Sequence, residues 1–337
     1  MVRVAINGFG RIGRQVLQAG ISDPDIEWVA VNDMTDTHTL AHLLKYDSVY
    51  GRFPGTVEAM DSIIKVNGKE IKVVRETNPE KLPWKELKID IVVESTGRFT
   101  KAEDAKAHIR AGAKKVIISA PAKGNDITIV KGINEHLVKP EHIIMSNASC
   151  TTNCLAPMVK VLNDNFKVDK GYMVTAHAYT GDQRLVDGPH SDLRRSRAAA
   201  HSIIPTTTGA ARAVGEVIPE LKGKLDGFAI RVPVICGSIV TFICNVKKST
   251  TREELNKLFK SVSENELKGI LEYTEDPIVS NDVLKNPHSC VFDALSTEVM
   301  DGTFVTVSGW YDNEWGYSNR MVDIIKIVYK GDVKWHT

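Results

Sequence analysis

Cys150 is the residue of this sequence best placed to act as a nucleophile. It stands in the segment 148–154, just before an apolar run at helical spacing. This position predicts the first turn of a helix, where backbone N–H groups and the helix dipole favour the thiolate, the nucleophilic form of cysteine. A lone cysteine is equally often a small buried apolar residue, so the spacing alone leaves both interpretations open.

A phosphate-binding glycine pattern directly follows the first predicted strand and opens the first predicted helix. Gly8, Gly10 and Gly13 form Gly-x-Gly-x-x-Gly. Gly8 permits the tight turn, Gly10 lets the backbone approach a pyrophosphate, and Gly13 allows close packing of helix and strand. The next predicted strand leads to Asp33, whose carboxylate would bind the adenosine ribose hydroxyls and repel a 2′-phosphate. The sequence therefore predicts a dinucleotide site that favours NAD over NADP.

The apolar pattern changes at Cys150, and this change predicts two domains. Short strands alternate with helices before it, and longer strands follow it; the strands are expected over 2–6, 26–31, 90–97, 116–119, 143–146, 172–176, 228–232, 239–244 and 304–308. We therefore expect an α/β protein with a Rossmann-type parallel sheet in an NAD-binding domain, residues 1–149. An α+β catalytic domain with a mixed or antiparallel sheet follows over 150–315. The amphipathic pattern within 316–337 predicts a helix that packs back on the NAD-binding domain.

Two short patterns predict where helices begin. Thr100 and Glu103 have the spacing of a capping box, and so do Thr251 and Glu254. The first of these helices is expected to stop near Gly112, because glycine commonly ends helices.

Several residues of the second half could assist a nucleophilic thiol. His177 follows a predicted strand, and its imidazole could stabilise the thiolate and then act as base and acid. A histidine at a strand end is more often structural, and spacing cannot show that this one reaches the sulfur. Candidate anion ligands include Thr180, Arg195, Thr208, Gly209 and Arg231. The arginines around position 195 could equally form a solvated face or a subunit interface.

A thiol beside a nicotinamide suggests one class of reaction. The thiolate adds to an aldehyde, hydride leaves to NAD, and the resulting thioester is cleaved by a second nucleophile. Sites for phosphate would make that second nucleophile inorganic phosphate, or would anchor a phosphorylated substrate, or both.

The composition limits the remaining classes of function. A formal net charge of +1 gives no electrostatic reason to expect a nucleic acid or membrane partner. Five cysteines, an odd number in a long chain, do not suggest a disulfide framework, and no neighbouring set completes a metal site. We therefore expect a cytoplasmic protein without a bound metal.

The segments 7–14, 148–154, 177–180 and 310–318 resemble phosphorylating glyceraldehyde-3-phosphate dehydrogenase, and the similarity covers nearly the whole chain. The resemblance implies that Cys150 is the nucleophile and His177 its base in the reversible, NAD- and phosphate-dependent oxidation of glyceraldehyde 3-phosphate to 1,3-bisphosphoglycerate. It implies a homotetramer. It also implies cofactor contacts from Arg11, Ile12, Asp33, Ser119 and Asn313, and substrate or phosphate contacts from Ser149, Thr151, Thr180, Arg195, Thr208, Gly209 and Arg231.

The sequence departs from the family pattern at three places. Gly188 replaces the leucine common in NAD-specific members and leaves room for some use of NADP. Thr77 replaces an arginine near the adenine, and the segment 234–237 replaces a turn that usually contains threonine and proline. The alternatives to the main hypothesis are a dehydrogenase acting on erythrose 4-phosphate and a non-catalytic NAD-binding protein. A cysteine hydrolase is improbable, because the glycine pattern is present and a hydrolase signature is not.

Overall fold

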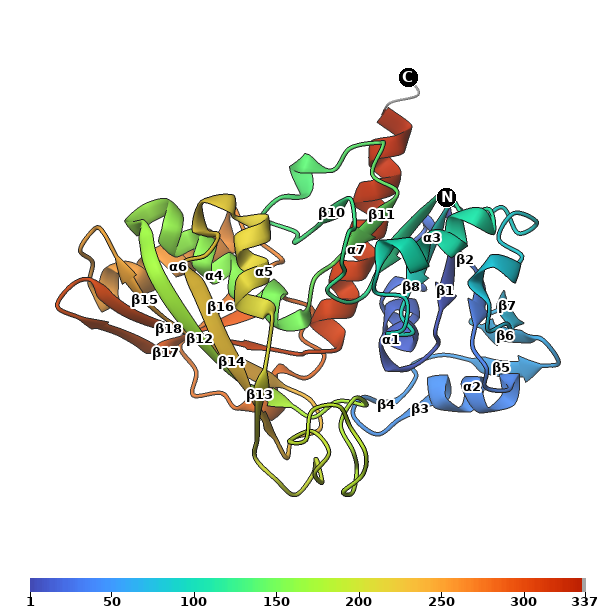
Figure 1. The fold of residues 1–337 in the computed structure, drawn as a ribbon, viewed down its shortest axis with the longest axis horizontal. Coiled ribbons are helices and arrows are strands. Elements are labelled where there is room, and N and C mark those ends of the chain that lie inside the picture. Colours follow the sequence, from blue (N-terminus) through green and yellow to red (C-terminus); the bar gives the residue numbers. More distant parts are fainter. Residues whose placement is uncertain (335–337) are drawn as a thin grey trace. The chain divides into compact units, whose positions relative to one another are not determined.

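The computed structural model describes residues 1–334, which form two compact units (Figure 1). Unit 1 contains Met1–Ile129, Glu135–Ala148 and the chain from Ser318 onward, and unit 2 contains Val130–Asn134 and Ser149–Tyr317. Residues 335–337, the end of the predicted C-terminal segment, lie outside the described residues.

Unit 1 is built on a sheet of nine strands with the order β10-β11-β9-β8-β1-β2-β7-β6-β5. Its first seven strands in this order are parallel, and β6 and β5 extend the sheet as an antiparallel hairpin. The strands are β1 (Val2–Asn7), β2 (Ile26–Asn32), β5 (Val57–Met60), β6 (Ile63–Val66), β7 (Lys69–Val74), β8 (Ile91–Glu94), β9 (Lys115–Ile118), β10 (Ile127–Thr128) and β11 (Ile144–Ser146), with β3 (Tyr46–Asp47) and β4 (Gly51–Arg52) forming a separate pair.

Helices accompany this sheet and complete the core of unit 1. They are α1 (Arg11–Gly20), α2 (Thr37–Lys45), α3 (Ala102–Arg110) and, from Ser318 onward, α7 (Trp315–Lys334), with short 3₁₀ turns at Pro79–Lys81 and Glu135–Leu137. The central strand β8 is buried at every position, as expected for a parallel strand covered on both faces. A salt bridge of 2.7 Å between Lys326 and Asp23 joins α7 to the turn after α1.

Unit 2 is built on a mixed sheet of seven strands with the order β13-β14-β12-β15-β18-β17-β16. The strands are β12 (Val168–Ala178), β13 (Ile204–Thr207), β14 (Leu225–Val232), β15 (Ser238–Val246), β16 (Leu271–Thr274), β17 (Cys290–Met300) and β18 (Phe304–Tyr311); the helices are α4 (Cys150–Phe166), α5 (Ala210–Val217) and α6 (Arg252–Glu264), with 3₁₀ turns at Pro219–Leu221 and Ser280–Val283. Buried and half-buried residues alternate along β15, because the helices pack on one face of the sheet.

The architecture confirms the predicted fold class, an α/β protein with a Rossmann-type parallel sheet followed by an α+β part with a mixed sheet. One predicted helix start is wrong. Backbone hydrogen bonds with Lys123 hold Thr100 and Lys101 extended, so α3 begins at Ala102 without a side-chain cap. At α6, Thr251 caps the helix through the N–H of Glu254, as the spacing predicts.

Candidate active site

Cys150 and His177 lie in contact in unit 2. Cys150 is the first residue of α4, and His177 is near the end of β12. The Sγ atom of Cys150 lies 3.4 Å from Nε2 of His177. The imidazole and the other four cysteines are buried, whereas Cys150 is half-buried. The structure thus brings together the two residues that the sequence could not place beside each other.

The hydrogen bonds of His177 define which nitrogen faces the sulfur as an acceptor. Nδ1 lies 2.7 Å from the carbonyl oxygen of Ala178, so Nδ1 carries the proton and donates it. Nε2 is then an acceptor directed at Cys150. Burial, and after it the positive charge of Arg231, lowers the pKa of His177 to about 3. The imidazole is therefore neutral near pH 7.

Opposing effects act on the proton affinity of Cys150. Burial of the sulfur raises the pKa of the Cys150 thiol, although the charge of Arg231 and a backbone hydrogen bond from Thr151 lower it. Desolvation therefore outweighs the helix terminus and the nearby positive charge. The resting pair is a thiol and a neutral imidazole, so His177 can remove the proton as the sulfur reacts.

A chain of hydroxyl groups fixes the residue that follows Cys150. The hydroxyl of Thr175 donates to the carbonyl oxygen of Ile239 at 2.9 Å, so it accepts from Tyr311 at 3.1 Å. Tyr311 in turn accepts from the hydroxyl of Thr151 at 3.0 Å. The ring of Tyr311 also packs edge-on against that of His177. Tyr311 therefore orients both neighbours of the sulfur.

Two arginines make the surroundings of His177 positive. Nη1 of Arg231 lies 3.1 Å from the carbonyl oxygen of Ala178 and 3.3 Å from the hydroxyl of Thr180, while its buried Nε has no hydrogen-bond partner in the described structure. Burial, and then the charge of Arg195, lowers the pKa of Arg231. Two guanidinium groups with this mutual repulsion favour an anion between them.

Arg195 is held in place by its own partners. Its guanidinium donates to Asp182 at 2.7 Å, to the hydroxyl of Thr206 at 3.0 Å and to the carbonyl oxygen of Thr207 at 3.2 Å. Asp182 also contacts His190. Arg195 is thus a positioned cation that is part of a network rather than of a freely solvated face.

The other predicted phosphate ligands lie at two helix N-termini that pack together. Ser149 caps α4 by accepting from the N–H of Thr152 at 3.0 Å. Thr208 accepts from the N–H of Ala210 at the start of α5, where Gly209 takes the cap position. The hydroxyl of Thr152 contacts the carbonyl oxygen of Ala210 at 3.4 Å, so the two termini are neighbours. Helix N-termini attract anions through their N–H groups and dipoles.

The segment 234–237, which departs from the family pattern, holds Asn313. The side-chain oxygen of Asn313 accepts from the N–H of Gly237 and the hydroxyl of Ser238, both at 3.0 Å. Gly237 has φ +86°, and a Cβ there would lie 2.2 Å from the carbonyl oxygen of Ser280. Ser238 also accepts from the N–H of Ala178, which links Asn313 to the residue after His177. The segment 234–237 therefore helps to hold the side chain of Asn313 in a defined orientation.

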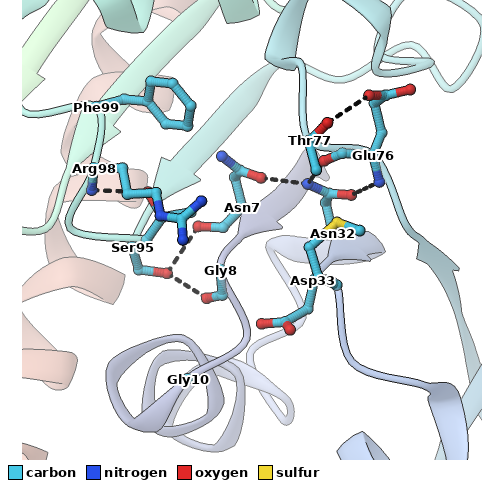
Figure 2. A pocket seen from close by; sticks show the side chains of 12 residues that line it. Asn7, Gly8, Gly10, Asn32, Asp33, Glu76, Thr77, Ser95, Arg98 and Phe99 are labelled. Carbon is cyan, nitrogen blue, oxygen red and sulfur yellow. Dashed lines mark hydrogen bonds between the residues drawn. The ribbon is translucent and has the colours of Figure 1, made fainter. Parts of the chain in front are cut away.

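A separate pocket of about 270 Å³ lies in unit 1 at the carboxyl ends of the parallel strands (Figure 2). Gly8, Gly10 and Asp33 line it, as predicted for a dinucleotide site. The carboxylate of Asp33 accepts from the N–H of Phe9 at 2.9 Å and of Thr35 at 3.0 Å. The remaining lining residues are Asn7, Asn32, Met34, Glu76, Thr77, Ser95, Thr96, Arg98 and Phe99.

The backbone of this pocket fits a pyrophosphate. Gly8 has φ +91°, and a Cβ there would lie 2.6 Å from the backbone nitrogen of Thr96. A Cβ on Gly13 would lie 2.2 Å from the carbonyl oxygen of Gly8, whereas one on Gly10 would meet nothing within 4 Å. The space beside Gly10 is therefore the open approach to the N-terminus of α1, which no side chain caps.

Five predicted cofactor residues do not line this pocket. They are Arg11, Ile12, Gly13, Ser119 and, in unit 2, Asn313. Arg11 pairs with Asp47 at 3.2 Å, and the N–H of Ser119 donates to the carbonyl oxygen of Glu94. Arg11, Ile12 and Gly13 nevertheless form the first turn of α1, so their backbone, rather than their side chains, is placed to meet a phosphate.

Sequence reasoning missed Tyr311, Thr175 and most of the side chains around the unit 1 pocket. Tyr311 is part of a distinctive segment, but nothing in its spacing indicates a contact with Thr151, 160 residues earlier. In the described part of the chain, no cluster of three or more His, Cys, Asp or Glu side chains could hold a metal ion. Among the helices of residues 1–334, none combines the length and apolar composition needed to cross a bilayer.

Comparison with known proteins identifies both parts of the chain. Residues 2–102 match the family "Glyceraldehyde 3-phosphate dehydrogenase, NAD binding domain", and residues 149–313 match "Glyceraldehyde 3-phosphate dehydrogenase, C-terminal domain". A glyceraldehyde-3-phosphate dehydrogenase of Geobacillus stearothermophilus is 60% identical over 324 residues, 96% of this chain and 97% of the relative. Glyceraldehyde-3-phosphate dehydrogenase 2 of Streptomyces avermitilis is 58% identical over 329 residues, 97% of this chain and 98% of the relative. With both family regions matched and this identity over nearly its full length, the chain belongs to the NAD-dependent glyceraldehyde-3-phosphate dehydrogenase family.

Proposed function

We propose that this chain catalyses the reversible oxidation of D-glyceraldehyde 3-phosphate to 1,3-bisphosphoglycerate with NAD and inorganic phosphate. The observation that carries the proposal is the contact of 3.4 Å between Sγ of Cys150 and the acceptor nitrogen of His177. This contact supplies the nucleophile and the base that thioester chemistry requires, in a chain that belongs to a family of NAD-dependent dehydrogenases.

The first step is addition of the thiol to the aldehyde. Nε2 of His177 takes the proton of Cys150 as Sγ forms a bond to the aldehyde carbon, and the proton passes to the former carbonyl oxygen. His177 is unprotonated at neutral pH, so Nε2 can act as the acceptor in this transfer. The product is a thiohemiacetal on Cys150.

Oxidation converts the thiohemiacetal into a thioester. NAD supplies the hydride acceptor, and Gly8, Gly10, Gly13 and Asp33, with the N–H groups of Arg11 and Ile12, would hold it. We assign Ser119 and Asn313 as further cofactor contacts; the oxygen of Asn313 is occupied by Gly237 and Ser238, so its amide nitrogen is the group that would donate to a carboxamide. His177 accepts the hydroxyl proton of the thiohemiacetal as the C–H bond breaks.

Phosphate then attacks the thioester carbon and the C–S bond breaks. Cys150 leaves as a thiolate and takes back the proton held by His177, which regenerates the thiol and the neutral imidazole. We assign the anion contacts of substrate and attacking phosphate to Ser149, Thr151, Thr180, Arg195, Thr208, Gly209 and Arg231. The mutual repulsion of Arg231 and Arg195 and the two adjacent helix N-termini support this assignment. Because Thr151 donates its hydroxyl proton to Tyr311, its backbone N–H is the donor it would offer to an anion.

We further propose an assignment of domains along the chain. Residues 1–149 form the NAD-binding domain, 150–315 the catalytic domain, and 316–337 a C-terminal segment whose helix, within the described residues, completes the first. The ion pair between Lys326 and Asp23 supports the last of these. The resemblance to the family supports a homotetramer, and five free thiols suit the reducing cytoplasm.

The test is NADH formation from glyceraldehyde 3-phosphate, measured with and without inorganic phosphate. We expect turnover to require phosphate and to be faster with this aldehyde than with erythrose 4-phosphate. Repeating the assay with NADP measures how far the protein can use NADP, for which Gly188 leaves room. Turnover without phosphate, or a preference for the four-carbon aldehyde, would reject the proposed reaction, and NAD binding without turnover would indicate a non-catalytic protein.

A further inference from the structure

A continuous chain of buried polar side chains lies beneath the pocket of unit 1. It begins at Trp84, whose indole N–H lies 3.0 Å from Nδ1 of His108 on α3. An indole nitrogen can only donate, so Nδ1 accepts and the proton of the imidazole is on Nε2. Nε2 lies 3.0 Å from Oε2 of Glu94 and donates to it. Trp84 and His108 are 0% exposed, and Glu94 is 2% exposed.

The carboxylate of Glu94 in turn holds one wall of the pocket in place. Its Oε1 accepts from the backbone N–H of Thr96 at 2.9 Å and from the hydroxyl of Thr96 at 2.5 Å. The hydroxyl of Thr96 accepts in turn from the N–H of Arg98 at 3.1 Å. Both residues line the pocket, so a carboxylate that does not line it fixes the backbone of that wall.

The same carboxylate also reaches the opposite wall. Oε2 of Glu94 accepts from Asn7 at 2.6 Å, and the side-chain oxygen of Asn7 accepts from Asn32 at 2.7 Å. Asn32 then donates to the carbonyl oxygen of Glu76 and accepts from its N–H, both at 2.9 Å. Figure 2 shows Asn7, Asn32 and Glu76 joined in this way beside Gly8 and Asp33.

We infer that His108 is a positioning residue for NAD, which acts through Glu94 and Asn7 on both walls of the pocket. His108 itself does not line the pocket. It supplies the donor that keeps Oε2 of Glu94 directed toward Asn7, and Trp84 fixes the tautomer that makes this donation possible. Buried polar networks hold a defined geometry only when each member has its partner, so removal of one donor loosens the others.

The test is the dissociation constant for NAD, and separately for AMP, measured by calorimetry on the purified full chain. His108→Leu removes both hydrogen bonds, and we expect NAD and AMP to bind about tenfold more weakly, the lower end of what loss of a ligand-orienting hydrogen bond costs at metal sites. With saturating NAD, kcat should stay unchanged while KM for NAD rises. His108→Gln keeps an acceptor for Trp84 and a donor for Glu94, so it should restore binding.

Val116→Ala serves as the matched control. Val116 lies on β9 in the same core cluster as Trp84, is fully buried and makes no side-chain hydrogen bond. It should lower thermal stability without changing the affinity for NAD. If His108→Leu does not fold, Trp84→Phe tests the same chain more mildly by removing the indole donor, and we expect NAD binding to weaken there too.

Normal binding of NAD in the His108→Leu protein, or in Trp84→Phe if that is the folded variant, would overturn the inference. Equal weakening in Val116→Ala would overturn it as well, because general softening of the core would then explain the effect. Loss of kcat without a change in affinity would also contradict a positioning role. Since the measurement is binding, it does not depend on which aldehyde the protein oxidises.

Discussion

The pocket of unit 1 and the thiol site of unit 2 are built on different principles. The pocket is shaped by backbone: glycines at fixed spacing, an uncapped helix N-terminus and side chains that serve mainly to hold loops. The thiol site is shaped by side chains that shift one another's proton affinity, with His177 buried between Cys150 and Arg231. The backbone site should fail on added volume, whereas the side-chain site should fail on the change of a single atom.

The largest effect should come from replacing one atom of the side-chain site. Cys150→Ser substitutes an alcohol, a far poorer nucleophile at neutral pH, and kcat should fall by more than about 10³-fold. NAD affinity, measured by calorimetry, should remain that of the wild type, because the residues lining the pocket belong to unit 1. Activity close to normal would remove Cys150 from the mechanism.

His177→Asn should slow turnover by about 10²–10⁴-fold, the usual contribution of a general acid–base group. The amide is smaller and cannot accept the thiol proton, while Arg231 keeps its bonds to Ala178 and Thr180. Steady-state assays should show the loss in kcat with little change in KM for phosphate. If KM for phosphate rises instead and kcat is retained, His177 binds an anion and does not act as the base.

Two glycine variants should separate volume inside the fold from volume in the ligand space. Gly13→Ala forces a Cβ to 2.2 Å from the carbonyl oxygen of Gly8, so the melting temperature and NAD affinity should both fall, with a cost of about 1–3 kcal/mol in stability. Gly10→Ala meets no protein atom within 4 Å, so stability should be retained while NAD binds about tenfold more weakly. Equal NAD affinity in Gly10→Ala and wild type would place the pyrophosphate elsewhere.

The smallest expected effect is on how the free energy of unfolding depends on pH. The pKa of His177 is about 3 in the folded chain and 6.5 in the unfolded chain, so only the unfolded state takes up this proton between those values. The free energy of unfolding should therefore fall as pH drops from 6.5, by up to about 1.4 kcal/mol per pH unit from this group alone. Urea unfolding at pH 7 and pH 5 should show a smaller loss in His177→Asn than in wild type. Equal losses would mean that the pKa of His177 is the same in the folded and unfolded states.

The sequence predicted the backbone site better than the side-chain site, for a physical reason. Gly8 and Gly10 are required by local geometry, and their order between a strand and a helix appears within a few residues. Tyr311, which orients Thr151 and packs on His177, contacts them only because the sheet of unit 2 places β18 beside α4 and β15 beside β12. Such contacts depend on the whole topology.

The same distinction explains one local error. The cap expected at Thr100 failed because Lys123, more than twenty residues away, pairs with that segment as a bridge. It also explains why desolvation of the Cys150 sulfur, which raises the pKa of the thiol, was not foreseen: desolvation is a property of the folded site, whereas the helix terminus that opposes it is visible in the sequence. The fold class itself depends on repeated patterns and was predicted correctly.

The make-up of unit 1 has a consequence for how the chain folds as it is synthesised. Unit 1 needs the chain from Ser318 onward, where Lys326 pairs with Asp23 and Val322 lies beside Gly20. These residues leave the ribosome after unit 2, although the rest of unit 1 precedes almost all of unit 2. Unit 2 is complete at Tyr317, so it can fold before unit 1 does. This is the reverse of the usual order, in which N-terminal domains fold first. Until then the nascent parallel sheet lacks its last helix.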